Sequence, residues 1–258
     1  TALRLKAIDP QAVFAVLPSD HVILKENSYL QILDTAFNVA AANDILMTLG
    51  ISPTRPDIGY GYIQYETNSA IQGVAKVLSF KEKPELQTAE LYLASGNYLW
   101  NAGMFVWSVE AIIKAFERYS PGILEILSED VTCFNTENEQ EYVNRLYPLT
   151  QNISIDYAIL ERADNVCTIP ADIGWSDLGT WNSLHAYLAN NDDKVVIGKN
   201  VYLDNCKNII VRSNNNKQVV IKGLEDFIVV DEDDALLIFP KSAEQEIKSV
   251  VNKLHLDK

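Results

Sequence analysis

Apolar and polar residues follow two periods along the first two-thirds of the chain, which predicts a succession of strands and helices. The apolar run from Val13 to Leu17 ends at Pro18 and predicts a strand buried on both faces. Helical periodicity predicts a helix over residues 29–49, closed by Gly50. Further strands are predicted at 59–63, 73–80, 104–107 and 166–169, and further helices at 85–96, 109–128, 138–147 and 154–163. This order is typical of an α/β fold, and we expect a mostly parallel sheet.

The pattern changes after about residue 190. Short β-rich runs alternate with turn-rich joints over residues 195–239, and an amphipathic helix is expected over 243–254. We therefore predict two domains. An α/β domain covers residues 1–190, and a small β-rich domain with a closing helix covers residues 191–258.

Composition narrows the possible functions. Of the 258 residues, 48% are hydrophobic, so a sizeable core is expected, and the formal net charge is -14. That charge argues against a surface for nucleic acid or anionic lipid, although a few local cations or a metal ion can still hold a phosphorylated substrate. Three widely spaced cysteines without a CxxC pair indicate a reducing, cytoplasmic location and no structural zinc. The chain has no apolar run of the roughly 20 residues that a membrane helix needs.

Two aspartates follow predicted strands, at the edge where open α/β sheets bind ligands. Asp20 comes directly after the first strand, and Asp177 lies in GWSDLGTW after the strand at 166–169. Each could simply cap a turn or a helix. Two carboxylates at two strand exits are also what a hard divalent cation needs beside substrate phosphate.

Three other segments combine polar groups with glycine or aromatic residues. Glu82 and Lys83 end a strand and could bind a sugar hydroxyl and a phosphate, or form a solvated charged turn. Asn101 and Gly103 lie between aromatic residues, where an amide can bond vicinal hydroxyls and glycine permits a close approach. A cap and turn beside core aromatics is the other interpretation. The GYGY stretch at 59–62 presents the same two options.

Taken together, these segments resemble the sugar-1-phosphate nucleotidyltransferases, and within them the mannose-1-phosphate guanylyltransferase branch. The resemblance runs in order through nearly the whole chain. Its motifs are LPSDH (17–21), GYGYI (59–63), FKEKP (80–84), NYLWNAGMF (97–105), SIDYAILE (154–161), GWSDLGTW (174–181) and GLEDFIVVDEDDALLIFPK (223–241).

The resemblance implies a Rossmann-like nucleotidyltransferase fold and assigns a role to each motif. Asp20 and Asp177 would hold a catalytic Mg²⁺, and Lys83 would bind the sugar phosphate as the third catalytic residue. Glu82 would bind mannose hydroxyls. Asp156 would lie near the sugar, although its predicted place at a helix start equally suits dipole capping. The sugar pocket would be lined by Tyr60, Gly61, Asn97, Asn101 and Gly103.

The implied reaction is nucleotidyl transfer from GTP to mannose 1-phosphate, giving GDP-mannose and pyrophosphate, in a homodimer. Two alternatives remain. The enzyme could use another sugar phosphate or another base, or the chain could be a non-catalytic regulatory subunit that binds sugar nucleotides. Nothing in residues 1–16 resembles the Gly-rich nucleotide loop with which this family begins. The expectation is therefore an N-terminally incomplete domain with little activity by itself.

Overall fold

The computed structural model describes residues 1–67, 73–189, 193–214 and 216–254. They form two compact units. Unit 1 consists of Thr1–Ser19 and Ile23–Trp175, and unit 2 consists of Asp20–Val22 and Ser176–Lys258. The domain boundary predicted near residue 190 falls outside the described residues.

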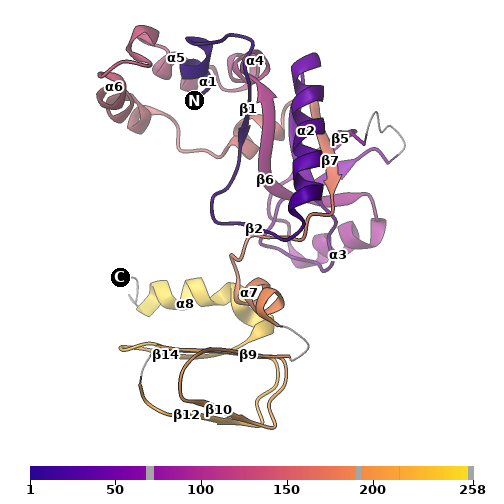
Figure 1. Cartoon of the computed structure of the whole chain (residues 1–258), viewed down its shortest axis with the longest axis vertical. Helices are drawn as coiled ribbons and strands as arrows, with labels where there is room; N and C mark the ends of the chain where they lie inside the picture. Colours follow the sequence, from indigo (N-terminus) through magenta and orange to yellow (C-terminus); the bar gives the residue numbers. More distant parts are fainter. Residues whose placement is uncertain (68–72, 190–192, 215, 255–258) are drawn as a thin grey trace. The chain divides into compact units, whose positions relative to one another are not determined.

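The centre of unit 1 is a six-stranded mixed sheet (Figure 1). In order across the sheet, its strands are β1 (Val13–Val16), β6 (Tyr98–Ser108), β3 (Leu46–Ile51), β7 (Val166–Ala171), β5 (Ala75–Lys81) and β4 (Tyr62–Tyr65). The prediction of a mostly parallel sheet is wrong, because among the described strands of this sheet only β3 and β7 pair in parallel. Strand β6 also pairs with β4, so that the sheet partly closes on itself. Strand β4 pairs antiparallel with both β5 and β6, and antiparallel neighbours need no crossover connection.

Helices cover both faces of this sheet. Residues of α2 and α3 pack on one face, and residues of α4 and η3 pack on the other. The helices of unit 1 are α1 (Ala2–Lys6), α2 (Glu26–Ala42), α3 (Leu86–Ser95), α4 (Val109–Tyr119), α5 (Pro121–Leu127), η1 (Val131–Cys133), α6 (Glu139–Leu146), η2 (Tyr147–Leu149) and the π-helical η3 (Asp156–Leu160). The chain thus forms the expected layered α/β domain, with the sheet between two helical layers.

The predicted helix over residues 29–49 merges two elements. Helix α2 ends at Ala42 and Asn43 is extended, with φ of −139° and ψ of 150°. All six residues of β3 are buried. An apolar run buried on both sides fits a central strand as well as a helix, and periodicity alone does not separate the two. Pro121 similarly divides the predicted helix at 109–128 into α4 and α5, because its ring removes a backbone donor.

Unit 2 is built from two stacks of short strands. One sheet has the order β14 (Leu236–Pro240), β13 (Phe227–Asp231), β11 (Ile209–Ser213) and β9 (Lys194–Gly198), and the second pairs β10 (Val201–Asp204) with β12 (Val219–Lys222). The stacked pairs are parallel, apart from the antiparallel β13–β14 pair. Apolar residues of both stacks meet in one core. The predicted C-terminal β-rich unit is therefore present and has the form of a short solenoid.

Polar side chains repeat along this solenoid every 18 residues. Ser213 donates to Asp231 over 3.0 Å at the end of β11 and β13, and Asn208 donates to Asp226 just before the start of the same two strands. Asn208 and Asp226 both have positive φ, at 45° and 62°. Asn and Asp tolerate this left-handed conformation better than most residues, so the corners of successive rungs carry the same chemistry.

Three helical segments complete unit 2. They are α7 (Trp181–Leu188), η4 (Lys241–Glu246) and α8 (Ile247–Leu254). Trp181, Leu184 and Ile247 pack against the outer face of the four-stranded sheet. The helix predicted over 243–254 thus begins as a 3₁₀ turn and becomes α-helical at Ile247.

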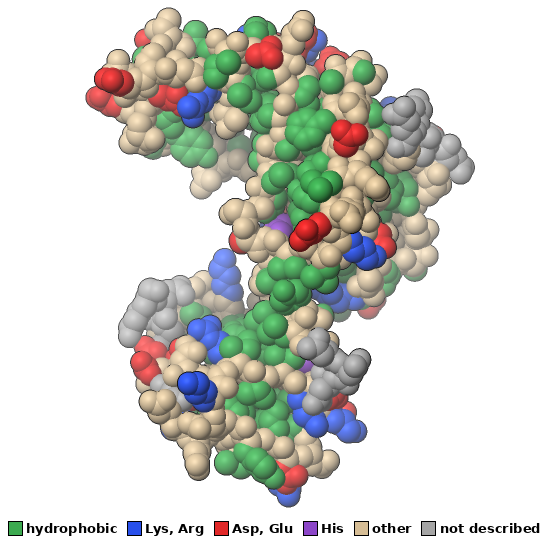
Figure 2. Space-filling model, in the orientation of Figure 1, with side chains coloured by type: hydrophobic (Ala, Val, Ile, Leu, Met, Phe, Trp, Pro, Cys, Tyr) green, Lys and Arg blue, Asp and Glu red, His purple; other side chains and the backbone are tan. Residues whose placement is uncertain are grey.

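Several large apolar side chains of unit 1 are exposed near β1 and the start of α2. Their exposed fractions are 42% for Val16, 41% for Leu17, 64% for Leu24 and 62% for Leu30. Figure 2 shows apolar side chains on the visible face over this part of unit 1. Strand β1 ends the strand order, so one of its edges lacks a strand partner among the described residues.

Candidate functional site

Five of the predicted site residues lie together in unit 1. This group, the Asn101 cluster, consists of Gly61, Glu82, Asn101, Gly103 and Asp156. Strand pairing assembles it, because Tyr62 of β4 lies opposite Lys81 of β5 and Trp100 of β6. The neighbours of these three residues along the chain are Gly61, Glu82 and Asn101, and the Asn101 N–H donates to the Gly61 carbonyl over 2.8 Å.

A bulge in β6 sets the direction of the Asn101 side chain. In the β3–β6 pair, Thr48 lies opposite Phe105 and Gly50 lies opposite Asn101, so the stretch of β6 contains more residues than the stretch of β3 that it faces. The extra residues include Gly103, whose φ of 67° is a conformation that glycine adopts without strain. Bulges of this kind redirect side chains beside functional sites.

Hydrogen bonds hold the Asn101 carboxamide at both ends. Its Oδ1 accepts from the Gly103 N–H at 3.1 Å and from the Thr48 hydroxyl at 3.3 Å. Its Nδ2 donates to Asp156 Oδ1 at 3.1 Å. The donor at Gly103 and the carboxylate at Asp156 fix which end of the amide is oxygen. Thr48 lies on a strand that the sequence pattern did not reveal, and it was missed.

Glu82 lies against the backbone at Gly61. A Cβ atom on residue 61 would approach Glu82 Oε2 to 2.5 Å, so glycine is needed for this carboxylate to stand where it does. The Glu82 side chain is 12% exposed and pairs with Lys83 Nζ at 3.1 Å. Its backbone N–H donates to Glu161 Oε1 over 3.3 Å. Glu161 ends the SIDYAILE motif and was not predicted as a site residue.

Burial raises the pKa of the Asp156 carboxyl above its usual value, and the nearby charge of Glu82 raises that pKa further. The charge of Glu82 thus disfavours the ionised form of Asp156. Both carboxyl groups can also accept hydrogen bonds from neighbouring hydroxyl groups. The cluster is therefore suited to a polyhydroxylated ligand.

Tyr60 and Asn97 are placed differently from the Asn101 cluster. The Tyr60 ring is buried and packs edge-on against Trp100 and Trp175, with centroids 5.0 Å and 5.3 Å away. The Asn97 carbonyl accepts from Tyr65 N–H, and Asn97 Oδ1 is buried without a hydrogen-bond partner in the described part of the chain. The structure therefore does not join Asn97 to the Asn101 network.

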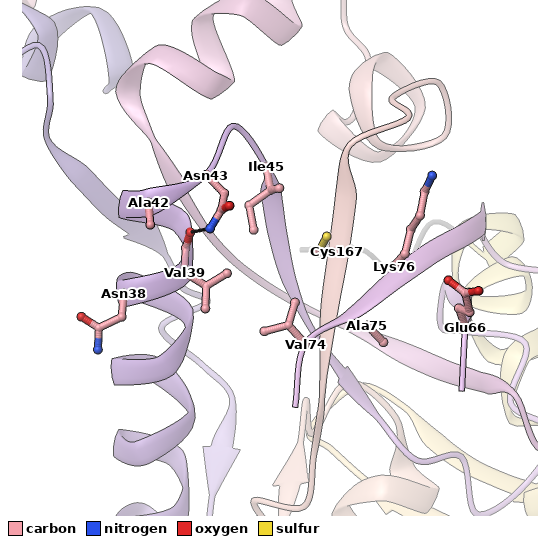
Figure 3. Close-up of a pocket in the computed structure, with 10 residues that line it drawn as sticks. All are labelled: Asn38, Val39, Ala42, Asn43, Ile45, Glu66, Val74, Ala75, Lys76 and Cys167. Carbon is pink, nitrogen blue, oxygen red and sulfur yellow. Dashed lines mark hydrogen bonds between the residues drawn. The ribbon is translucent and has the colours of Figure 1, made fainter. Parts of the chain in front are cut away.

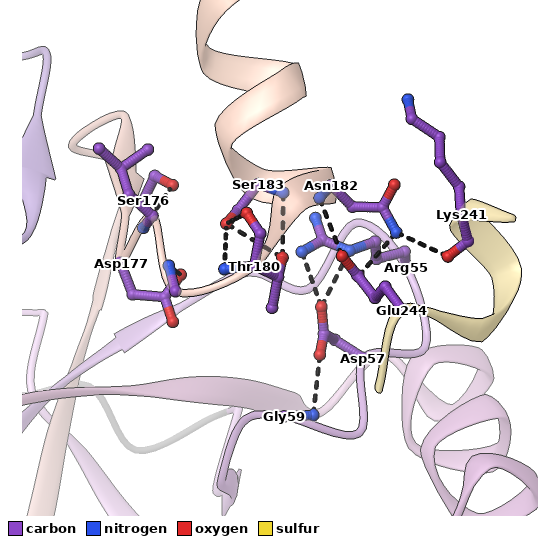
Figure 4. Close-up of polar contacts among 12 residues, drawn as sticks. Arg55, Asp57, Gly59, Ser176, Asp177, Thr180, Asn182, Ser183, Lys241 and Glu244 are labelled. Carbon is purple, nitrogen blue, oxygen red and sulfur yellow. Dashed lines mark hydrogen bonds and ion pairs between the residues drawn. The ribbon is translucent and has the colours of Figure 1, made fainter. Parts of the chain in front are cut away.

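An ion pair precedes the Tyr60–Gly61 segment. Arg55 donates from Nε and Nη2 to Asp57 Oδ2, at 3.0 Å and 2.7 Å, and Asp57 Oδ1 accepts from the Gly59 N–H at 2.8 Å (Figure 4). The Arg55 guanidinium also lies 5.2 Å from the centre of the Trp100 ring. These contacts fix the turn that leads to Gly61, and no motif in the sequence had pointed to Arg55 or Asp57.

Asp20 and Asp177, the aspartate pair, both belong to unit 2. Strand β2 (Val22–Ile23) pairs with β8 (Trp175–Ser176), and the Leu24 N–H donates to the carbonyls of Ile173 and Gly174. Along this pair the residue numbers of β8 fall as those of β2 rise, so the two strands are antiparallel. Asp20 and Asp177 therefore lie beyond the same end of this ladder.

The two carboxylates have different surroundings. The Asp20 side chain is 85% exposed and stands 4.0 Å from His21 Nε2. Asp177 is half-buried, and its Oδ1 accepts from the Gly179 N–H at 3.0 Å in the loop before the Thr180–Ser183 capping box of α7 (Figure 4). A Cβ on residue 179 would come within 2.6 Å of Asp177 Oδ2, so Gly179 leaves room for that oxygen.

The aspartate pair suits a hard divalent cation of the Mg²⁺ type. Carboxylate oxygens are its preferred protein ligands, and Mg²⁺ usually takes only one or two of them beside water and substrate phosphate. No group of three or more His, Cys, Asp or Glu side chains spaced for a metal occurs in residues 1–67, 73–189, 193–214 and 216–254.

Unit 1 also contains a pocket of about 680 Å³ that lies away from these residues. It is lined by residues from the end of α2, the start of β5 and Cys167 of β7 (Figure 3). None of the predicted site residues lines it.

All three cysteines of the chain are free thiols. Among the described residues, no helix is long and apolar enough to cross a membrane.

Comparison with known proteins agrees with this architecture. Residues 2–194 match the Nucleotidyl transferase family, and residues 198–254 match the MannoseP isomerase/GMP-like beta-helix domain. The chain is 32% identical over 262 residues to a mannose-1-phosphate guanylyltransferase of Escherichia coli K12, covering 99% of this chain and 54% of the relative. It is 31% identical to the alginate biosynthesis protein AlgA of Pseudomonas aeruginosa, covering 98% of this chain and 53% of the relative.

A solved structure supports the same assignment across both units. A crystal structure from Thermus thermophilus, described as a mannose-1-phosphate geranyltransferase, has a TM-score of 0.82 at 26% identity. The alignment covers 98% of this chain and 73% of that one. The chain spans about half the length of the curated relatives it matches. The resemblance predicted from the motifs is confirmed: the chain belongs to the nucleotidyl transferase family, in the mannose-1-phosphate guanylyltransferase group that carries the β-helix domain.

Proposed function

We propose that this chain takes part in nucleotidyl transfer from GTP to mannose 1-phosphate, giving GDP-mannose and pyrophosphate. In this reaction the chain would bind the sugar phosphate and the metal ion. The observation that carries the proposal is the Asn101 cluster, in which carboxylates and a fixed amide are gathered around a close-approach glycine. The match to mannose-1-phosphate guanylyltransferases at about one-third identity supports the choice of sugar and base.

Residues of unit 1 would bind the sugar phosphate. Glu82, which is partly buried, would accept from mannose hydroxyl groups, and the second N–H of Asn101 would donate to one of them. Lys83 adjoins Glu82, and its ammonium would neutralise charge on the phosphate. Alignment of the reactant and neutralisation of charge are the main contributions that phosphoryl and nucleotidyl transfer require from a protein.

Residues of unit 2 would hold the cation. Asp20 and Asp177 lie beyond one end of the β2–β8 ladder and supply two carboxylates. When bound, Mg²⁺ would screen the repulsion between phosphate groups and stabilise the charge that develops on them. His21 stands beside Asp20 and would help to orient it.

The proposed transfer needs no covalent enzyme intermediate. A phosphate oxygen of mannose 1-phosphate forms a bond to the α-phosphorus of GTP. The bond between that phosphorus and the bridging oxygen breaks, and pyrophosphate leaves with the electron pair. In this scheme Lys83 acts only through its charge.

Calorimetry on the 258-residue chain tests the sugar-binding part. We expect mannose 1-phosphate and GDP-mannose to bind in the presence of Mg²⁺, and Glu82→Gln to weaken binding by about 10-fold or more, since hydrogen bonds to a charged group contribute roughly 1.5–3 kcal/mol. Glu85→Gln, at the exposed start of α3, is the matched control and should bind as the parent does. Absence of binding by the parent chain, or equal loss in both variants, would contradict the proposal.

A panel of ligands distinguishes the neighbouring possibilities. Tighter binding of glucose 1-phosphate than mannose 1-phosphate would replace the proposed sugar, and preference for a uridine or thymidine sugar nucleotide would replace the proposed base. Sedimentation equilibrium tests the homodimer that the resemblance implies, with a single-chain mass as the contrary result.

A further inference from the structure

Thr48 is a fully buried polar residue beside the Asn101 cluster. It lies on β3 with no exposed surface. Its hydroxyl stands 3.3 Å from Asn101 Oδ1 and 3.3 Å from the Met104 carbonyl oxygen. One proton shared between two acceptors makes a three-centre hydrogen bond. Thr48 therefore cannot touch a ligand itself and acts only through the strand that carries Asn101.

The contacts of Asn101 leave one hydrogen-bonding position open. Its Oδ1 has two lone pairs, which the Gly103 N–H and the Thr48 hydroxyl fill. Its Nδ2 has two N–H groups, and one of them donates to Asp156. Among the described residues, only the second N–H has no protein acceptor. Asn101 is thus held as a donor toward anything that binds in the cluster.

We infer that Thr48 is a positioning residue for sugar-phosphate binding: it occupies the amide oxygen of Asn101 and fixes the remaining N–H toward a ligand hydroxyl. The inference rests on the proposed function, since it assigns Thr48 to the same sugar site. Loss of the Thr48 hydroxyl frees a lone pair on Asn101 Oδ1 and leaves the amide anchored by two contacts in place of three.

The neighbouring strand supplies a matched control. Thr168 of β7 lies directly opposite Thr48 in the parallel β3–β7 pair and is equally buried. Its hydroxyl oxygen has no hydrogen-bond partner in the described part of the chain. Thr48→Val and Thr168→Val make the same chemical change at adjacent buried positions. Only the first removes a contact to Asn101.

The experiment measures mannose 1-phosphate affinity by calorimetry in the full chain with Mg²⁺. We expect Thr48→Val to weaken binding by about 3–10-fold, the loss of one net hydrogen bond. Thr168→Val should stay within about 2-fold of the parent on the same scale, because it breaks no such bond. Thr48→Ser keeps the hydroxyl and should restore most of the affinity. Thermal denaturation confirms that each variant is folded at the assay temperature, and Thr48→Ala replaces Thr48→Val if the latter is not.

A double-mutant cycle tests whether Thr48 acts through Asn101. In an Asn101→Ala background, Thr48→Val should cause no further loss of affinity, since the group that it positions is gone. Equal affinity of Thr48→Val and the parent, an undiminished loss in the Asn101→Ala background, or failure of Thr48→Ser to restore binding would each overturn the inference. Absence of binding by the parent chain would instead refute the proposed function, so the two failures are distinguishable.

Discussion

The Asn101 cluster and the aspartate pair differ in how the fold holds their carboxylates. In unit 1, Asp156 is hydrogen-bonded to Asn101 and Glu82 lies against the Gly61 backbone. In unit 2, Asp20 is largely exposed and comes two residues before the start of the two-residue strand β2. The first group is organised before any ligand arrives. The carboxylate of Asp20 is open to solvent, where a cation could reach it.

This difference predicts two kinds of response to substitution. A change in the Asn101 cluster displaces a neighbouring group and so alters ligand binding through geometry. A change of charge in the aspartate pair alters ion binding and leaves the surrounding structure in place, because the exposed side chain of Asp20 contributes little to packing.

Gly61→Ala should have the largest effect. The new Cβ would meet Glu82 Oε2 at 2.5 Å, and that carboxylate is the flexible end of its side chain. Glu82 therefore moves at small cost in stability and leaves its place in the cluster. We expect mannose 1-phosphate affinity to fall by about 10–100-fold, equivalent to roughly 1.5–3 kcal/mol of hydrogen bonding to a charged group. Calorimetry measures the loss.

Gly122→Ala is the matched control for that substitution. Gly122 lies in α5, where an added Cβ has no atom within 4 Å and φ is not positive. It should leave affinity unchanged and raise the stability of the chain slightly, since alanine is the better helix former. A similar loss of affinity in both variants would show that the Glu82 position does not govern binding.

Asp20→Asn and Asp177→Asn should have the next largest effect, on the cation alone. Asparagine at 177 keeps an oxygen for the Gly179 N–H, so the turn survives while the charge is lost. With Mn²⁺ as a spectroscopic probe for Mg²⁺, we expect each variant to bind the ion about 10-fold more weakly or worse. Their melting temperatures should match that of the parent.

The control for the aspartate pair is Asp9→Asn, which changes an exposed aspartate whose side chain accepts from the Gln11 N–H. It should leave Mn²⁺ affinity unchanged. If Asp20→Asn and Asp177→Asn retain the affinity of the parent, the aspartate pair holds no ion and the contrast between the two regions disappears.

Asp156→Asn should produce a smaller, pH-dependent change in stability. The folded-state pKa of Asp156 is raised by burial and then by Glu82, so protonation stabilises the folded state. That contribution is fully present below the unfolded-state pKa of about 3.9 and is lost as pH rises through the higher folded-state pKa. At pH 7 the ionised carboxylate therefore opposes folding, and the neutral variant should be more stable than the parent.

Urea denaturation at pH 7 and near pH 4 checks this sign. The variant should gain free energy of unfolding at pH 7, and the gain should shrink toward pH 4. An asparagine at position 156 can still accept from the Asn101 amide, so the network survives the change. A variant that is less stable than the parent at pH 7 would show that the charge of Asp156 is needed for folding.

The sequence predicted which residues form the Asn101 cluster better than it predicted the strands that assemble it. Asn101, Gly103, Glu82 and Asp156 stand in motifs that resemble a known family. The strand that carries Thr48 was interpreted as the end of a helix, because six consecutive buried residues show no period. Burial of β3 on both faces results from the helices that pack on the two sides of the sheet. Such tertiary packing cannot be read from the local sequence pattern.

The solenoid of unit 2 shows the complementary limit. Its short β-rich runs predicted a β domain, and that is what the chain forms. The 18-residue spacing that aligns Asn208 with Asp226 and Ser213 with Asp231 was not recognised. The paired residues differ in type from rung to rung, so self-similarity of letters is weak. Asn and Asp, which tolerate positive φ, recur at this spacing and are the sequence signal that marks the corners.

Thr168→Val should have the smallest effect, and it sharpens the contrast within unit 1 itself. The Thr168 hydroxyl is buried without a partner in the described part of the chain, so its desolvation is uncompensated. Valine has nearly the same shape and needs no hydrogen bond. Relief of an unpaired buried group should raise the free energy of unfolding by up to about 1 kcal/mol, or about 2–4 °C in melting temperature for a chain of this size. Thr48→Val should shift the melting temperature the other way, because its hydroxyl is bonded. If both variants lose stability alike, the two threonines are equivalent packing residues and the bonded hydroxyl of Thr48 has no special place in the cluster.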